Sequence, residues 1–305
     1  MQFIHLHRHA GAHVKGPNDE IRHVVVTPVR DEEEYIADCI SSMINQTIKP
    51  KLWVIIDDNS QDGSPGILSR SEEDNDWIKV IRPDILGTRE RGGRIAKLVN
   101  CGIEEIDVEW DFLSKIDADM ILTDDYFERL FSEFISDSKL GISSGNCIVV
   151  RGSSEVLEKV SEHHTRGGLK TYRAECYFEI GGIIEINGWD GMDNILARLN
   201  GWETKNWPDI TAIHQRETGS YFGKVKGNYE SGKIAYYLCY YMPYLFGRIM
   251  VKCFERPYLI GSMAFFFGFI GETIRFKPRF TDRDAIKFQR RMQRDIILRR
   301  FGLLR

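Results

Sequence analysis

The sequence predicts an α/β fold in which a mostly parallel sheet is flanked by helices. Two observations carry this prediction: short apolar runs alternate with segments of helical spacing, and several runs end in acidic residues. With 305 residues, of which 42% are hydrophobic and 28% charged, the chain can bury a sizeable core and is not of the disordered class.

The apolar and β-branched runs predict strands at residues 23–29, 52–56, 77–81 and 110–116. Helical spacing predicts helices at residues 31–46, after the turn at Asp62-Gly63, and at 91–106. In sheets built this way, ligands bind at the carboxyl ends of the strands. That edge is therefore where we expect the functional residues.

Acidic segments follow three of the predicted strands, at residues 27–32, 57–60 and 117–119. Asp117-Ala118-Asp119 offers two hard oxygen ligands to a divalent cation that carries a nucleotide diphosphate. An acidic pair such as Asp57-Asp58 can also stabilise only a turn. The chain has neither Gly-x-Gly-x-x-Gly nor a P-loop, which disfavours dinucleotide oxidoreductases and P-loop kinases.

Taken in order, these motifs resemble those of the family 2 glycosyltransferases, which have the GT-A fold. The resemblance runs from Val24 to about Gly219 and rests on residues 27–32, 54–64, 92–100 and 117–119. It implies an inverting, metal-dependent transfer of a sugar from a nucleotide-diphosphate donor to an acceptor hydroxyl. The glycan or lipid-linked acceptor would belong to polysaccharide, glycolipid or cell-envelope glycan synthesis. The alternatives are a sugar-phosphate nucleotidyltransferase and a catalytically silent scaffold protein.

The resemblance also implies roles for individual residues. Those expected to bind the nucleotide sugar are Thr27, Val29, Arg30, Glu32, Asp57, Asp58, Arg94, Lys97, Asp117 and Ala118. Asp119, helped by Asp117 and His214, is expected to bind Mn²⁺ or Mg²⁺. Arg94 and Lys97 would neutralise diphosphate charge, although a solvated helix face explains them too. A structural role is the alternative for His214.

The general base is predicted on the segment that follows Gly188. Where the family has Glu-Asp ahead of a helix, this chain has Trp189-Asp190, with Asp193 three residues later. Either aspartate can accept the acceptor proton, and Asp190 is favoured. A structural alternative makes Asp190 the helix N-cap and places Asp193 in the first turn.

The resemblance implies a GT-A catalytic domain (23–220), which leaves an N-terminal arm (1–22) and a C-terminal helical extension (221–305). The histidines of the arm, His5, His7, His9 and His13, have no fixed geometry and are read as incidental. From Arg248 onward there are 14 Lys and Arg against 5 Asp and Glu, a balance of +9 within a net charge of -4. This does not resemble a nucleic-acid-binding surface.

The apolar stretches of the extension are shorter than the roughly 20 residues of a membrane-spanning helix. With the basic tail they predict interfacial helices on an anionic membrane, or alternatively a helical lid. The six scattered cysteines include no C-x-x-C pair, which favours reduced thiols. No secretory signal is visible before His23. The expected location is therefore cytoplasmic, peripheral at the membrane face.

Overall fold

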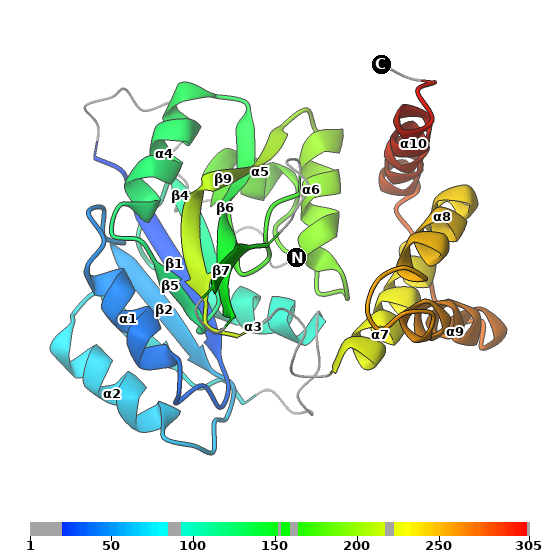
Figure 1. The fold of residues 1–305 in the computed structure, drawn as a ribbon. Coiled ribbons are helices and arrows are strands. Elements are labelled where there is room, and N and C mark those ends of the chain that lie inside the picture. The colour runs from blue at the N-terminus through cyan, green and yellow to red at the C-terminus, as the bar shows by residue number, and fades with distance from the viewer. Residues whose placement is uncertain (1–19, 85–92, 152–153, 159–163, 217–222, 304–305) are drawn as a thin grey trace. The chain divides into compact units, whose positions relative to one another are not determined.

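Strands and helices alternate through the first half of the chain, as the sequence predicts (Figure 1). The computed structural model describes residues 20–84, 93–151, 154–158, 164–216 and 223–303. The first elements are β1 (His23–Val29), α1 (Ile36–Ile44), β2 (Leu52–Asp57), α2 (Ser64–Asp74), β3 (Ile78–Ile81), α3 (Gly93–Glu104) and β4 (Phe112–Ile116). They are followed by β5 (Met120–Leu122), α4 (Tyr126–Ser136), β6 (Leu140–Arg151), β7 (Ser154–Leu157), β8 (Leu169–Arg173), α5 (Ala174–Glu179), α6 (Trp189–Leu199) and β9 (Glu203–His214).

Within the described residues the strands form one sheet in the order β3-β2-β1-β4-β8-β6-β9-β5, and β7 pairs with β6. The pairs from β3 to β4 are parallel, so the carboxyl ends of β1, β2 and β4 share one edge. Beyond β4 the sheet is mixed: β8 is antiparallel to β4 and β6, and β9 is parallel to β6.

Alternate residues of the central strands face the two helical layers. Val25, Trp53 and Ile55 belong to a core that also contains buried residues of α1, α2 and α4. On the other face, a Cβ at Gly102 of α3 would lie 2.8 Å from Val26 and 2.6 Å from Ile56. This period of two is what a strand buried on both faces requires.

Helix α1 is shorter than the predicted helix at residues 31–46, because its first residues form a polar turn. Asp31 has a positive φ of 54°. Its N–H donates to Ser60 Oγ at 3.0 Å, and the N–H of Glu32 donates to Ser64 Oγ at 2.9 Å. These bonds tie the end of β1 to the loop after β2, and the positive φ of Asp31 keeps that residue out of the helix.

The chain divides into two compact units, Met1–Arg216 and Glu217–Arg305. The second contains α7 (Gly223–Tyr237), α8 (Met242–Lys252), α9 (Ile260–Ile274) and α10 (Arg283–Arg300). Helices α7 and α9 meet closely at two glycines: a Cβ at Gly232 would lie 2.0 Å from the Phe265 carbonyl oxygen, and one at Gly268 2.1 Å from that of Tyr229. Among the described residues, no helix combines the length and apolar character needed to span a bilayer.

Candidate active site

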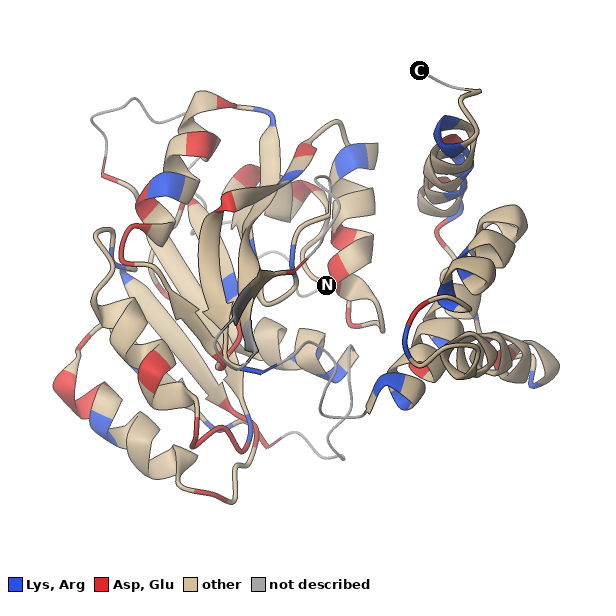
Figure 2. Cartoon of the chain, in the orientation of Figure 1, with Lys and Arg blue, Asp and Glu red and all other residues tan. Residues whose placement is uncertain are grey.

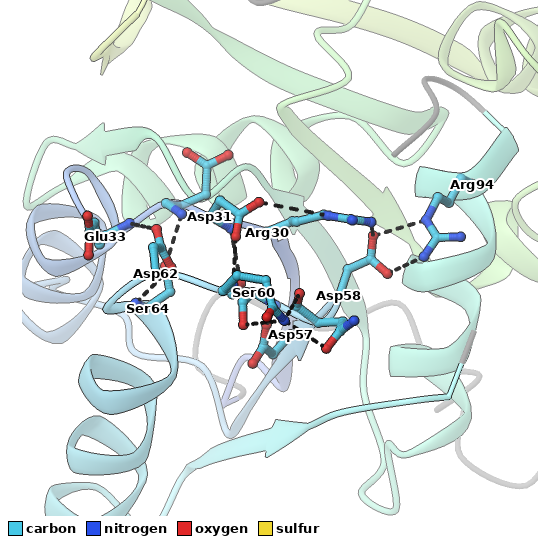
Figure 3. A network of polar contacts seen from close by, with 12 residues as sticks. Arg30, Asp31, Glu33, Asp57, Asp58, Ser60, Asp62, Ser64 and Arg94 are labelled. Atoms are coloured by element: carbon cyan, nitrogen blue, oxygen red, sulfur yellow. Dashed lines mark hydrogen bonds and ion pairs between the residues drawn. The ribbon is translucent and has the colours of Figure 1, made fainter. Parts of the chain in front are cut away.

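The carboxyl ends of β1 and β2 hold a network of charged side chains (Figure 3). The carboxylate of Asp58 accepts hydrogen bonds from Arg94 Nε at 3.0 Å and Nη2 at 2.5 Å, and from Arg30 Nη1 at 3.2 Å. Asp58 is buried, and two guanidinium groups balance its charge. The guanidinium of Arg94, predicted to face the diphosphate, is thus fixed on Asp58.

The neighbouring Asp57 stabilises a turn, which is the alternative role that the sequence allowed for this acidic pair. Its Oδ1 accepts the N–H of Ser60 at 2.9 Å, and its Oδ2 accepts from Arg82 Nε at 3.1 Å. Asn59 has a φ of 60°, a conformation that asparagine tolerates in turns. The turn holds the loop after β2 beside the end of β1.

Three other predicted donor-binding residues lie in different surroundings. The Thr27 hydroxyl is buried and accepts a hydrogen bond from Trp53 Nε1 at 2.9 Å, and Val29 packs in the core. Lys97 is exposed on α3 and has no hydrogen bond or ion pair with another described residue. The side chains of Thr27 and Val29 therefore stabilise the sheet, while Lys97 lies in solvent.

Asp119 lies at the centre of a second charged group, after β4. Its Oδ2 accepts from Arg216 Nε at 2.6 Å and lies 3.2 Å from His214 Nε2. Arg216 Nη2 also donates to Glu32 Oε1 at 2.6 Å, so this group reaches the end of β1. Antiparallel pairing of β5 with β9 sets His214 opposite Met120, which follows Asp119 directly. The strand register therefore brings together residues 95 positions apart in the sequence.

Charges within this group shift the pKa values of its members. Burial raises the pKa of Asp119, but the hydrogen bonds and charges of His214 and Arg216 outweigh it and leave the value lowered. Burial lowers the pKa of His214, but Asp119 outweighs it and leaves the value raised. Asp119 is thus kept as the carboxylate that a cation needs.

Asp117 and Asp190 flank two consecutive glycines. A Cβ at Gly168 would lie 2.6 Å from Asp117 Oδ2, and a Cβ at Gly167 would lie 3.3 Å from Asp190 Oδ2. Asp117 also contacts the buried Lys115, while Ala118 between the two motif aspartates is buried. The Asp-x-Asp segment and the start of α6 therefore lie next to each other.

The two candidate bases differ in their surroundings. Asp193 is fully buried; it accepts a hydrogen bond from the Tyr172 hydroxyl and lies 3.5 Å from Lys170 Nζ. Burial raises its pKa to about 6, against the opposing effect of Lys170. Asp190 is half-buried, and among the described residues its carboxylate has no hydrogen-bond or ion-pair partner. The helix N-cap is Gly188, so the reading of Asp190 as the N-cap is wrong.

Sequence reasoning missed the buried lysines at this site. Lys115 and Lys170 lie opposite each other in β4 and β8, and their Nζ atoms lie 5.8 and 5.3 Å from the ring centroid of Trp189. Lys170 also donates to the main-chain oxygen of Asp190. A lysine within a mostly apolar strand, as in the run Phe112–Ile116, was the available signal.

The donor atoms fit a cation that is shared with a substrate. Asp119 offers a carboxylate, and His214 beside it offers a ring nitrogen. Mg²⁺ and similar cations are often held by one or two protein carboxylates and completed by substrate phosphates. Asp119, His214 and the nearby Asp117 therefore suit a metal–diphosphate complex.

Comparison with known proteins decides the family. The sequence model for "Glycosyl transferase family 2" matches residues 24–188, more than half of the chain. The chain belongs to glycosyl transferase family 2. Its glycosyltransferase class, predicted from the sequence, is thereby confirmed.

Among curated relatives, the poly-beta-1,6-N-acetyl-D-glucosamine synthase of Staphylococcus aureus (strain COL) is 30% identical over 130 residues. That segment covers 43% of this chain and 29% of the relative, so the chain matches less than a third of the synthase's length. The synthase of Staphylococcus epidermidis is 27% identical over 130 residues, with the same coverage.

Solved structures confirm the GT-A fold. The mannosyltransferase PcManGT from Pyrobaculum calidifontis, in complex with GDP-Man and Mn²⁺, has a TM-score of 0.56 at 12% identity and covers 94% of this chain and 88% of its own. TarS 1-349 from S. aureus, in complex with UDP-GlcNAc, has a TM-score of 0.53 at 16% identity, covering 84% and 74%.

Proposed function

We propose that the chain transfers a sugar from a nucleotide-diphosphate donor to an acceptor hydroxyl, with a divalent cation and with inversion of the anomeric carbon. The observation that carries the proposal is the placement of Asp117 and Asp190 on either side of the Gly167-Gly168 step. One residue belongs to the Asp-x-Asp segment, and the carboxylate of the other has no hydrogen-bond or ion-pair partner among the described residues. A sugar bound there has its leaving diphosphate on one side and a proton acceptor on the other.

In this mechanism Asp190 takes the proton of the acceptor hydroxyl as its oxygen bonds to the anomeric carbon. The bond from that carbon to the diphosphate oxygen breaks in the same displacement, which inverts the configuration. Asp193, Lys170 and Tyr172 position the first turn of α6, because Lys170 donates to the main-chain oxygen of Asp190. They are positioning residues, since Asp193 is inaccessible to an acceptor.

The residues around Asp119 prepare the site for the donor. Arg216 and His214 fix the carboxylate of Asp119, and Lys115 contacts that of Asp117. Mn²⁺ or Mg²⁺ held by Asp119, Asp117 and His214 would stabilise the charge that develops on the leaving diphosphate. The structures of PcManGT in complex with GDP-Man and Mn²⁺ and of TarS 1-349 in complex with UDP-GlcNAc support a nucleotide-sugar donor. The poly-N-acetylglucosamine synthases support an acceptor in a polysaccharide or cell-envelope glycan.

A peripheral contact of the second unit with an anionic membrane belongs to the same proposal. Several apolar side chains of α8, α9 and the segment between them are more than half exposed: Phe246, Met250, Phe254, Leu259 and Phe267. Basic residues are numerous on α10 (Figure 2). Exposed aromatic side chains together with basic charge suit an anionic lipid surface. The six free thiols favour the cytoplasmic side.

Thermal unfolding with a panel of nucleotide sugars, with and without Mn²⁺, tests the transferase proposal. We expect one donor to stabilise the protein only when Mn²⁺ is present, by about 2.7 kcal/mol at a hundred times its Kd. Asp119→Asn should abolish this stabilisation and sugar transfer. Asp209→Asn, which changes an exposed carboxylate paired with Arg129, is the matched control. Donor binding that persists in Asp119→Asn with a chelator present contradicts the metal role.

Two further measurements address the other parts of the proposal. The product's anomeric configuration, read by NMR, should be opposite to that of the donor, and retention contradicts direct displacement. When vesicles are pelleted by centrifugation, the protein should leave the supernatant with anionic vesicles and stay in it with neutral ones. Equal recovery from both vesicle types contradicts the membrane contact.

A further inference from the structure

Three metal-binding side chains converge beside Asp119 without belonging to the Asp-x-Asp motif. Cys147 Sγ, a carboxylate oxygen of Glu158 and a ring nitrogen of His214 all lie within 4.8 Å of one another. Across the part of the chain that the structure describes, this is the one group of three or more His, Cys, Asp or Glu side chains that is so close. Neither Cys147 nor Glu158 has a role in the transfer reaction described above.

Strand pairing holds these ligands in place. In the parallel pair β6–β9, Cys147 lies opposite Ala212 and Val149 opposite His214, so Cys147 and His214 are diagonal neighbours on one face. The N–H of Glu158 donates to the Cys147 carbonyl oxygen at 2.9 Å, which brings the residue after β7 onto the same group. All three ligands are thus fixed by backbone hydrogen bonds.

The carboxylate of Glu158 is also oriented by a neighbour. Arg166 Nη1 donates to Glu158 Oε2 at 2.5 Å, and Arg166 Nη2 donates to the Glu158 main-chain oxygen at 2.9 Å. Arg166 Nε donates in turn to Asn146 Oδ1 at 2.7 Å. A carboxylate that accepts a hydrogen bond on one oxygen can still bind a metal, and such outer contacts are typical of metal sites. The Glu158 side chain is 21% exposed, which opens the group to solvent.

The donor set identifies the kind of metal. A thiolate, an imidazole and a carboxylate together select Zn²⁺ and similar thiophilic cations, whereas Mg²⁺ and Mn²⁺ prefer oxygen ligands. Three protein ligands with a fourth position left to water form a common four-coordinate zinc arrangement. We propose that Cys147, Glu158 and His214 form a second, thiophilic metal site that takes Zn²⁺.

This site has a consequence for the transfer reaction, which rests on the proposed function. His214 Nε2 lies 3.2 Å from Asp119 Oδ2, so the imidazole borders both metal positions. An imidazole that binds Zn²⁺ would no longer serve as a ligand to a cation at Asp119. Zn²⁺ should therefore inhibit the Mn²⁺-dependent activity through a site that needs Cys147.

Titration of the whole chain with Co²⁺ tests the site independently of activity. Co²⁺ replaces Zn²⁺ at such sites, and bound thiolate gives an ultraviolet charge-transfer band that Zn²⁺ removes by displacement. We expect this band at one equivalent of Co²⁺ in the wild type. It should vanish in Cys147→Ser and persist in the matched control Cys101→Ser, which removes a free cysteine of α3. Absence of the band in the wild type, or its persistence in Cys147→Ser, overturns the proposal.

Glu158→Gln keeps the thiol and covers the possibility that Cys147→Ser fails to fold. It should retain the charge-transfer band but weaken Co²⁺ binding by at least about tenfold. Unchanged Co²⁺ affinity in Glu158→Gln removes Glu158 from the site and overturns the three-ligand assignment. In a transfer assay with Mn²⁺, Zn²⁺ should inhibit the wild type and inhibit Cys147→Ser at least about tenfold less. Equal inhibition of both overturns the competition, whereas an absent transferase activity with an intact Co²⁺ band overturns only the proposed function.

Discussion

Replacing the two aspartates of α6 separately distinguishes a catalytic carboxylate from a structural one. Asp190→Ala removes a half-buried carboxylate that has no hydrogen-bond or ion-pair partner among the described residues. Asp193→Ala removes the acceptor of the Tyr172 hydroxyl and the nearest negative charge to Lys170. The first change should affect turnover, and the second should affect folding.

The structure sets the expected magnitudes. Loss of a general base lowers kcat by about 10²- to 10⁴-fold, or roughly 3–5 kcal/mol in barrier height. Asp190 lies in the first turn of α6, so its replacement costs at most about 1 kcal/mol of stability through the helix dipole. Asp193→Ala leaves a fully buried ammonium without its counter-charge, a loss of about 3–5 kcal/mol.

The assay pairs urea unfolding with initial rates of nucleoside diphosphate release from the stabilising donor. Asp190→Ala should keep the wild-type unfolding midpoint and the donor affinity while its kcat falls. Asp193→Ala should unfold at lower urea and recover part of the lost stability when Lys170→Met is added, because the unpaired charge is then gone. Rates are compared at a temperature where both variants are folded.

Two results would refute this reasoning. If Asp190→Ala retains kcat within about tenfold of the wild type, Asp190 is not the base. If Asp193→Ala keeps wild-type stability but loses turnover, the buried carboxylate acts in catalysis and the roles are exchanged.

Four further substitutions have outcomes that the structure predicts. The raised pKa of His214 means that its ion pair with Asp119 stabilises the fold below about pH 6.5, and this stabilisation is lost as the pH rises through the folded pKa. The lowered pKa of Asp119 means that its carboxylate stabilises the fold above about pH 3.8. Without metal, His214→Gln should therefore lower the free energy of unfolding more at pH 5.5 than at pH 8.5. Gly232→Ala should destabilise the second unit by about 1–3 kcal/mol, because its Cβ meets a carbonyl oxygen at 2.0 Å. Gly247→Ala, whose Cβ has no neighbour within 4 Å, should instead raise stability in the same urea titration by about 0.5–1 kcal/mol. Gly168→Ala should lower metal-dependent turnover by about 10²-fold with unchanged stability, because its Cβ would displace the first carboxylate of the Asp-x-Asp motif. Wild-type rates in Gly168→Ala would contradict that contact.

The order of the first strands and helices was readable from the sequence because it depends on local periodicity. The runs that became β1, β2 and β4 are mostly apolar, and in the structure these strands are buried on both faces. The acidic residues that follow them are adjacent in the chain to the strands that position them. Fold class, the acidic edge of the sheet and the family were therefore within reach of the sequence.

Side-chain partners were decided by the tertiary structure, because they join residues far apart in the chain. The pairing of the Arg94 guanidinium with Asp58, 36 residues away, could not be read from the sequence. The sequence favoured Asp190 over Asp193 but left both open as the base. In the structure Asp190 lies at the Gly167 segment and Asp193 is buried in the core.

The start of helix α1 and the side chains around His214 also depend on contacts that only the tertiary structure shows. The polar turn before α1 depends on hydroxyl groups of the loop after β2. The spacing of apolar residues within 31–46 gives no sign of these distant partners. Cys147 and Glu158 carry no motif. The register of β6 against β9 brings Cys147 to His214, and the pairing of β7 with β6 brings Glu158 to Cys147. The sequence by itself determined which residue types stand at the strand ends. The pairing of distant strands decided which of them meet, because a side chain's partner is set by register across the sheet and not by its neighbours in the chain.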